Sequence, residues 1–166
     1  MTEEAPSRTR KFSDQYSFQT QLVQRLVEGV SHEESMLQLP FEANCMNWIL
    51  GHIISRRQSA LETLGAESLW AESQLSHYKT GSDPILSSEQ AIRFETLMDD
   101  LQRSLSILQS ALQDADETLD RIVINDRGEK TAGQHIEGFL WHETYHTGQL
   151  EVLRAYIIAE RNAQHE

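Results

Sequence analysis

The stretch WHETYHTGQL, residues 141–150, contains two histidines in the order H-E-x-x-H. On a helix, side chains four residues apart lie on the same face, about 6 Å apart along the axis. This spacing allows His142 and His146 to bind one metal ion. Apolar residues recur along the same helical stripe, so we expect both histidines to face the interior of a helical protein. These apolar residues are Phe139, Leu150, Leu153 and Ile157.

Helical periodicity continues outward from this stretch along most of the chain. We expect four long amphipathic helices and little sheet. The expected helices cover about residues 12–30, 44–65, 88–116 and 131–160. Four such helices predict an all-α, up-down four-helix bundle, in which cofactor sites form from side chains that face each other across the core.

The segments between these helices carry turn and capping signals. Capping boxes are predicted at Ser87 and Thr131, and Gly65 is a natural helix stop. The polar stretch 66–87 is long for a connection in a compact domain, so we expect it to hold a short helix or to cover a site. Residues 122–128 predict a small hairpin or an extended crossing before the last helix.

Length and charge restrict the class of protein. A chain of 166 residues is expected to form one domain over 1–166, with residues 1–11 as a flexible tail. The net charge of −12 disfavours a nucleic-acid partner and an anionic membrane surface. The chain lacks an apolar run of about 20 residues and a secretory signal at its start, so we expect a cytoplasmic protein. The single cysteine, Cys45, is expected to be a small core residue.

The H-E-x-x-H pattern is also that of zinc proteases, but its surroundings disfavour a protease. The x-x-G-x-x-H continuation of the metzincins does not follow His146. Only 20 residues remain after His146, and their periodicity continues the same helix instead of starting another that would bring a third ligand. A helical bundle also lacks the sheet edge on which a peptide substrate is aligned.

A third metal ligand must therefore come from elsewhere in the chain. His32 and His77 lie in connections and are expected to be solvated, and His165 lies in the tail. His135 shares the stripe of His142 but lies about 10 Å away along the helix axis, too far to join the same ion. His52 remains, on an apolar helix, and is the best placed of the four histidines outside the tail.

The pattern N-x-x-x-W-x-x-G-H at 44–52, together with H-E-x-x-H-x-G-Q-L at 142–150, resembles the DinB/YfiT-like superfamily of four-helix bundles. The resemblance rests on Asn44, Trp48, Gly51, His52, His142, His146, Gly148, Gln149 and Leu150. It implies a three-histidine site for a divalent metal at His52, His142 and His146. It also implies a homodimer, and a metal-dependent hydrolase or a transferase that joins a low-molecular-weight thiol to an electrophile.

A three-histidine site leaves one to three coordination positions for water or for a substrate thiolate. Zn²⁺ and Ni²⁺ both suit imidazole ligands. By analogy with proteases, Glu143 is the candidate catalytic base, but it lies about 100° around the helix from His142 and equally suits a supporting role at the edge of the bundle. Gln149 is expected either to orient a ligand or to serve helix packing.

Two functions follow from the sequence. The first is a metal-dependent enzyme that acts on a small-molecule substrate. The second is a catalytically silent, metal-binding bundle that acts as a structural or interaction protein. A site open to solvent favours the enzyme, and a sealed site favours the structural protein.

Overall fold

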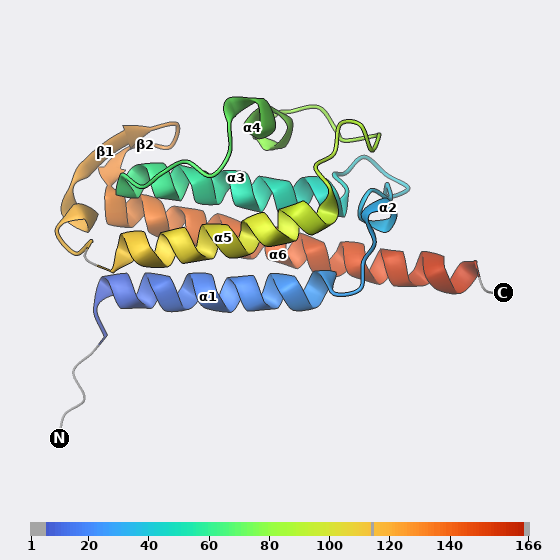
Figure 1. Ribbon diagram of the computed structural model, residues 1–166, viewed down its shortest axis with the longest axis horizontal. Coiled ribbons are helices and arrows are strands. Elements are labelled where there is room, and N and C mark those ends of the chain that lie inside the picture. The colour runs from blue at the N-terminus through green and yellow to red at the C-terminus, as the bar shows by residue number, and fades with distance from the viewer. Residues whose placement is uncertain (1–5, 114, 165–166) are drawn as a thin grey trace, which may run out of the picture.

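The computed structural model describes residues 6–113 and 115–164 and confirms an all-α fold built on a four-helix bundle (Figure 1). The long helices of this part of the chain are α1 (Arg8–Val27), α3 (Met46–Leu64), α5 (Phe94–Leu112) and α6 (Ala132–Ala163). Because the Ser7 side chain caps its first turn, α1 begins inside the stretch expected to be a tail. Among the helices described, none is long and apolar enough to cross a membrane.

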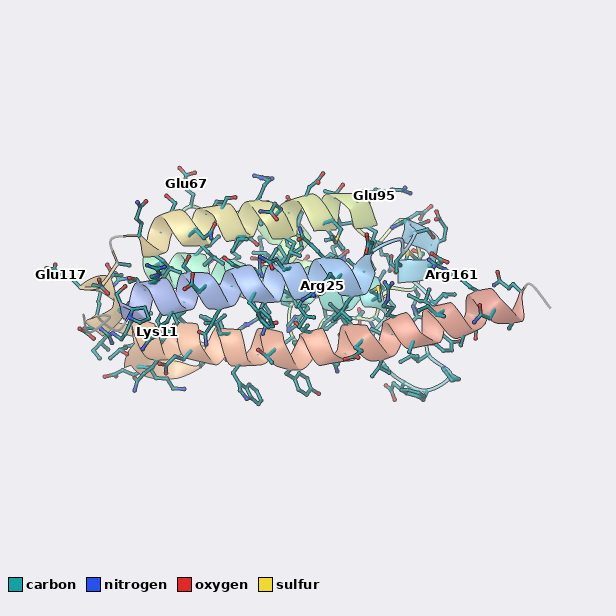
Figure 2. The ribbon with its side chains drawn as sticks, turned by 90° about the horizontal axis from the view of Figure 1, so that it is seen from below. Lys11, Arg25, Glu67, Glu95, Glu117 and Arg161 are labelled. Carbon is teal, nitrogen blue, oxygen red and sulfur yellow. The ribbon has the colours of Figure 1, made fainter. Side chains whose placement is uncertain are left out.

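The four long helices pack as a square, in which α1 and α3 lie at opposite corners. Each of these two helices packs against both α5 and α6 (Figures 1 and 2). The expected up-down order holds from α1 to α3 and from α5 to α6. It does not hold from α3 to α5, which run in the same direction because the connection 65–93 crosses back along the bundle (Figure 1). This connection contains the short helix α4 (Glu72–Tyr78).

The helix boundaries confirm two of the three capping predictions. Gly65 takes a left-handed conformation with φ of 76° and ends α3, and Thr131 forms the capping box that starts α6. The capping box predicted at Ser87 is wrong. There the Gln90 side chain binds a different backbone N–H, so the segment remains a turn and α5 begins only at Phe94.

The segment before α6 forms the predicted hairpin. Strand β1 (Ile122–Asn125) pairs in antiparallel register with β2 (Gly128–Thr131), directly after the short 3₁₀ helix η1 (Thr118–Asp120). His135 of α6 donates a hydrogen bond from Nε2 to the carbonyl of Val123, at 3.0 Å. This histidine therefore anchors the hairpin on α6 and lies outside the metal-ligand cluster described below, in line with its predicted distance from that site.

The short helix α2 (His32–Ser35) fills the corner where α1 passes to α3. It packs against α3 and α5, so His32 is buried and its Nδ1 accepts a hydrogen bond from the backbone N–H of Phe94. The prediction that this histidine is solvated is wrong. Arg161, near the end of α6, forms an ion pair with Glu34 and donates to the carbonyl of Gly29, which holds the end of α6 against α2 (Figure 2).

A buried arginine joins all four long helices in the core. Arg57 of α3 is 1% exposed and directs its five N–H groups to acceptors on the three other helices. Two N–H groups meet the carboxylate of Glu143 on α6, and the others meet Thr20 of α1 and Ser104 and the Leu101 carbonyl of α5. Full use of the donors offsets part of the cost of burying the charge.

Candidate metal centre

The structure brings His52 of α3 together with His142 and His146 of α6. One ring nitrogen from each residue can be chosen so that all three lie within 4.8 Å of one another. The Nε2 atoms of His142 and His146 are 3.2 Å apart. Two nitrogens that each bind one ion at about 2.1 Å are separated by roughly 3 Å, so this pair already has the spacing of shared ligands.

The opposite nitrogens of two of these rings have fixed partners. His52 donates from Nδ1 to the carbonyl of Tyr78 at 2.6 Å, and His146 donates from Nδ1 to Oε1 of Gln149 at the same distance. A neutral imidazole that donates from Nδ1 has its lone pair on Nε2. The two hydrogen bonds therefore leave both Nε2 atoms as acceptors, which is the arrangement that outer partners impose on metal-binding histidines.

His142 completes the donor set. Its Nδ1 is buried and has no partner among the described residues, so the contact of its Nε2 with His146 is its one hydrogen bond in that part of the chain. Since the Nε2 of His146 carries a lone pair, a proton or a cation must lie between the two nitrogens. Three neutral imidazoles facing one point thus fit a divalent metal ion.

Burial keeps these imidazoles in the neutral form that binds metals. It lowers the pKa of His52 to about 4 and that of His142 to about 3, and it also lowers the pKa of His146. For His142, the neighbouring imidazoles and the cations Arg127 and Arg56 lower the pKa further. At neutral pH, protons therefore compete little with a metal ion for these nitrogens.

Two motif residues of α3, Trp48 and Gly51, help to hold His52 in place because they contact the segment that follows the helix. Trp48 stacks on the His52 ring, with 4.7 Å between centroids and 10° between planes, and donates from Nε1 to Ser82. At Gly51, an added Cβ would lie 2.1 Å from Cδ1 of Tyr78. Only glycine therefore lets Tyr78 pack on α3 closely enough for its carbonyl to reach His52. The polar stretch 66–87, whose role was open, supports the site through α4.

The start of α3 holds one residue that sequence reasoning missed. Cys45, buried as expected, is the N-cap residue of α3, and Asn44, which precedes it, lines the pocket at the histidines. The missed residue is Asn47, which is fully buried, donates to the carbonyl of Ile92 and accepts from the Tyr78 hydroxyl. An asparagine within an otherwise apolar first turn was the available signal.

Glu143 lies in the core rather than in the pocket of the histidines. Arg57 binds both carboxylate oxygens, at 2.5 and 3.0 Å, and the side chain is 3% exposed. Glu143 is also absent from the lining of the pocket that contains the three histidines. Its role as a general base stays a prediction, while its contacts are those of a core ion pair.

The three histidines lie in the wall of a pocket of about 630 Å³ between α3, α6 and the loops before α3 and after α4. Gln149, Tyr145 and Trp48 line the same pocket. The rim of the pocket is open to solvent: the side chains of Phe41, Tyr145 and Val152, which line it, are each more than half exposed. A small molecule could therefore reach the imidazoles.

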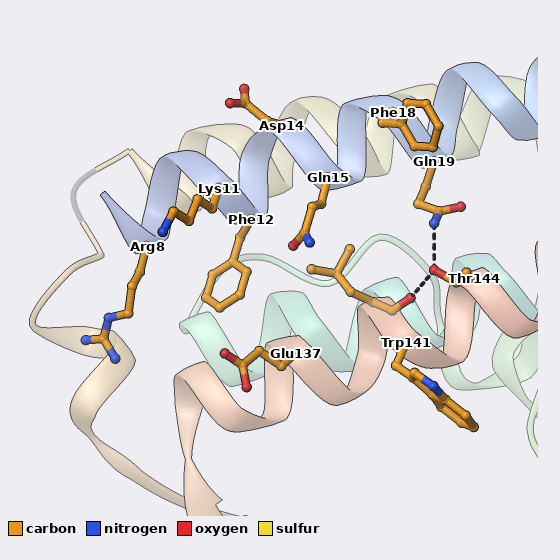
Figure 3. Close-up of a pocket in the computed structure, with 11 residues that line it drawn as sticks. Arg8, Lys11, Phe12, Asp14, Gln15, Phe18, Gln19, Glu137, Trp141 and Thr144 are labelled. Carbon is orange, nitrogen blue, oxygen red and sulfur yellow. Dashed lines mark hydrogen bonds between the residues drawn. The ribbon is translucent and has the colours of Figure 1, made fainter. Parts of the chain in front are cut away.

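A second hollow, of about 800 Å³, lies between α1 and α6 (Figure 3). Gln19 and Thr144 form a hydrogen bond of 2.6 Å between the two helices there, and Trp141 extends outward from α6 (Figure 3). Among the described residues that line this groove, no cluster of metal-binding side chains occurs. Among the residues described, the three histidines are the one group of three or more side chains that could hold a metal ion together.

The fold and the cluster define a four-helix-bundle protein with a three-histidine site, suited to a metal ion, between α3 and α6. The family model described as the DinB superfamily matches residues 15–150, and the chain belongs to this superfamily. The fold is similar to the crystal structure of a conserved protein from Enterococcus faecalis, with a TM-score of 0.71 and 18% identity over 93% of this chain and 99% of that one. Comparison with curated protein sequences gave no match.

Proposed function

We propose that this protein is a divalent-metal-dependent enzyme that uses His52, His142 and His146 to activate water or a low-molecular-weight thiol. The reaction is either a hydrolysis or the transfer of the thiol to an electrophile. The observation that carries the proposal is the convergence of three neutral imidazoles in the wall of a pocket that opens to solvent.

Each residue of the site has a part in this proposal. The three histidines hold the ion, with Zn²⁺ or Ni²⁺ as the best match to imidazole donors. A divalent ion held there would supply a Lewis acid that lowers the pKa of a bound water or thiol toward neutral pH. The Tyr78 carbonyl and Gln149 keep the Nδ1 protons of two ligands in place.

Metal analysis of the purified protein tests the proposal. We expect about one equivalent of divalent metal per chain, as a three-ligand site predicts. His142→Ala should release the ion, while His77→Ala, at an exposed position on α4, should retain it. Absence of metal from the native protein together with failure of reconstitution would exclude the site, and equal loss from both variants would show that the ligands are wrong.

Turnover assays then separate the enzyme from the catalytically silent alternative. The loaded protein should hydrolyse an ester or amide, or join a thiol to an electrophile, at a rate that His142→Ala abolishes. The alternative function, a structural or interaction protein, predicts full metal binding and no turnover. The open rim of the pocket favours the enzyme, since a structural metal site is usually closed.

We also propose a cytoplasmic homodimer. The net charge of −12 supports the absence of a nucleic-acid partner. The groove in Figure 3 supports self-association because Phe18 and Trp141 are more than half exposed beside it. Its lining also carries Lys11 and Glu137, charges of both signs that a second copy can match. Sedimentation should give a dimer that Trp141→Glu converts to a monomer and Phe41→Glu does not.

A further inference from the structure

We propose that the pocket at the three histidines takes an uncharged ligand with an aromatic or branched aliphatic body. The metal-binding group of this ligand, such as a thiol, points toward the histidines. The inference rests on the proposed function for the metal-binding group only. The preference of the pocket for an uncharged ligand body follows from the residues in its walls, which are present with or without an ion.

Apolar side chains line the pocket at two levels, among polar ones. Phe41, Tyr145 and Val152 form the outer level, and all three are more than half exposed, so they are available to a ligand. Trp48, Ile49 and Leu153 form the inner level and belong to the packed core. A ligand body in the pocket would therefore cover mainly the apolar surface of the outer level, which favours an aromatic or branched group.

The charges around the pocket disfavour an anionic body. Among the described residues that line it, Glu42 is the one carboxylate, and no lysine or arginine occurs. The cations that affect the histidines lie outside the pocket lining: Arg56 pairs with Asp126, and Arg127 donates to the carbonyl of Gly138. A carboxylate or phosphate on the ligand body would thus lose water without gaining a cationic partner.

A few polar groups in the pocket walls have no hydrogen-bond partner among the described residues, so they are available to one neutral polar group on the ligand. Gln149 accepts from His146 through Oε1, and its amide N–H groups have no acceptor among the described residues. Asn44 and the Tyr145 hydroxyl likewise have no partner within 6–113 and 115–164. An ether, carbonyl or hydroxyl on the ligand could bind one of them, which sets orientation without charge.

A matched pair of thiols tests the proposal: benzyl mercaptan, and its analogue with a carboxylate at the para position. The first measurement uses metal-free protein and follows the indole N–H signals of Trp48 and Trp141 by NMR. Benzyl mercaptan should shift the Trp48 signal, which belongs to the pocket, and leave that of Trp141 unchanged. The carboxylate analogue should bind at least about tenfold more weakly, because its charge has no partner there.

The second measurement repeats the titration on cobalt-loaded protein, where the absorption of Co²⁺ reports thiolate binding. Phe41→Ala should weaken the binding of benzyl mercaptan by about tenfold, because apolar contact with the ligand is lost. Phe18→Ala, which removes an exposed phenylalanine from the groove of Figure 3 and not from this pocket, should leave the affinity for benzyl mercaptan unchanged.

The outcomes separate the two proposals. Failure to take up Co²⁺, with the Trp48 shift and the preference for the neutral thiol retained, would overturn the metal-dependent function alone. Normal Co²⁺ uptake with equal or tighter binding of the carboxylate thiol would overturn the uncharged-ligand proposal alone. An equal effect of Phe41→Ala and Phe18→Ala would also overturn it.

Discussion

Glu143 follows His142 directly in the chain, yet its carboxylate forms a bidentate ion pair with Arg57 in the bundle core, with N–O distances of 2.5 and 3.0 Å. In zinc proteases with the H-E-x-x-H pattern, the glutamate acts as the general base beside the metal. Here the neighbouring histidine and glutamate serve different parts of the molecule. The histidine belongs to the three-histidine cluster that could hold a metal ion, and the glutamate joins α6 to α3.

Removal of this carboxylate should destabilise the fold. Glu143→Ala leaves the Arg57 charge buried without its partner, so we expect the free energy of unfolding to fall by about 3–5 kcal/mol. Urea denaturation measures this loss. Glu72→Ala, which breaks an exposed ion pair with Lys79, is the matched control and should change stability little. Unchanged stability of Glu143→Ala would contradict a structural role for the pair.

The close contact between Gly51 and Tyr78 should make the metal centre sensitive to one methyl group. Gly51→Ala places Cβ against the Tyr78 ring and moves the carbonyl that holds His52, so metal affinity should fall by about tenfold or more. Gly148→Ala is the control on α6, where an added Cβ meets no atom within 4 Å. Chelator competition should find parent-like affinity for the control, and equal losses in both variants would reject the packing argument.

The hydrogen bond from His146 to Gln149 should also support metal binding. Gln149→Leu removes the acceptor for the Nδ1 proton, and losses of this kind reduce metal affinity by about 10–100-fold. The same substitution at Gln109, an exposed residue on α5, controls for the added apolar surface. Isothermal titration with Zn²⁺ measures both proteins, and parent-like affinity in Gln149→Leu would exclude a supporting role for this amide.

The stability of the metal-free protein should decrease as pH falls from about 6.5 toward 4. The pKa of His52 is about 4 and that of His142 about 3 in the folded chain, against 6.5 for an ordinary histidine. The unfolded chain therefore binds more protons in this range, and protonation favours unfolding. Denaturation at pH 6.5 and 5.5 measures how the free energy of unfolding changes with pH. Both values lie above the range in which carboxylates titrate. His142→Asn should reduce this pH dependence. A free energy of unfolding that is the same at both pH values in the parent protein would contradict the prediction.

The sequence predicts those parts of the molecule that depend on local spacing. His142 and His146 are four residues apart on a long amphipathic helix, and that separation alone places both rings on one face. The hairpin before α6 and the stop at Gly65 follow from equally local turn chemistry. His52 is ninety residues earlier than His142, and it is connected to the same site by elimination of the other histidines and by the motif around it.

The remaining parts depend on contacts between distant segments. The carbonyl of Tyr78 holds His52, but a backbone carbonyl is present in every residue and leaves no signal in the sequence. Arg57 and Glu143 are 86 positions apart, so nothing local predicts that they pair. The buried state of His32 arises in the same way, from packing of α2 on α3 and α5.

The connection 65–93 crosses back along the bundle, and its helix α4 supplies the carbonyl that fixes His52. Docking of this crossover and binding of a metal ion are therefore linked equilibria, because each favours the same orientation of one imidazole. An ion that tightens the centre stabilises a segment whose side chains supply none of its three ligands. Local opening of the crossover would in turn release such an ion, so this segment would also set the residence time of a metal bound at the three histidines.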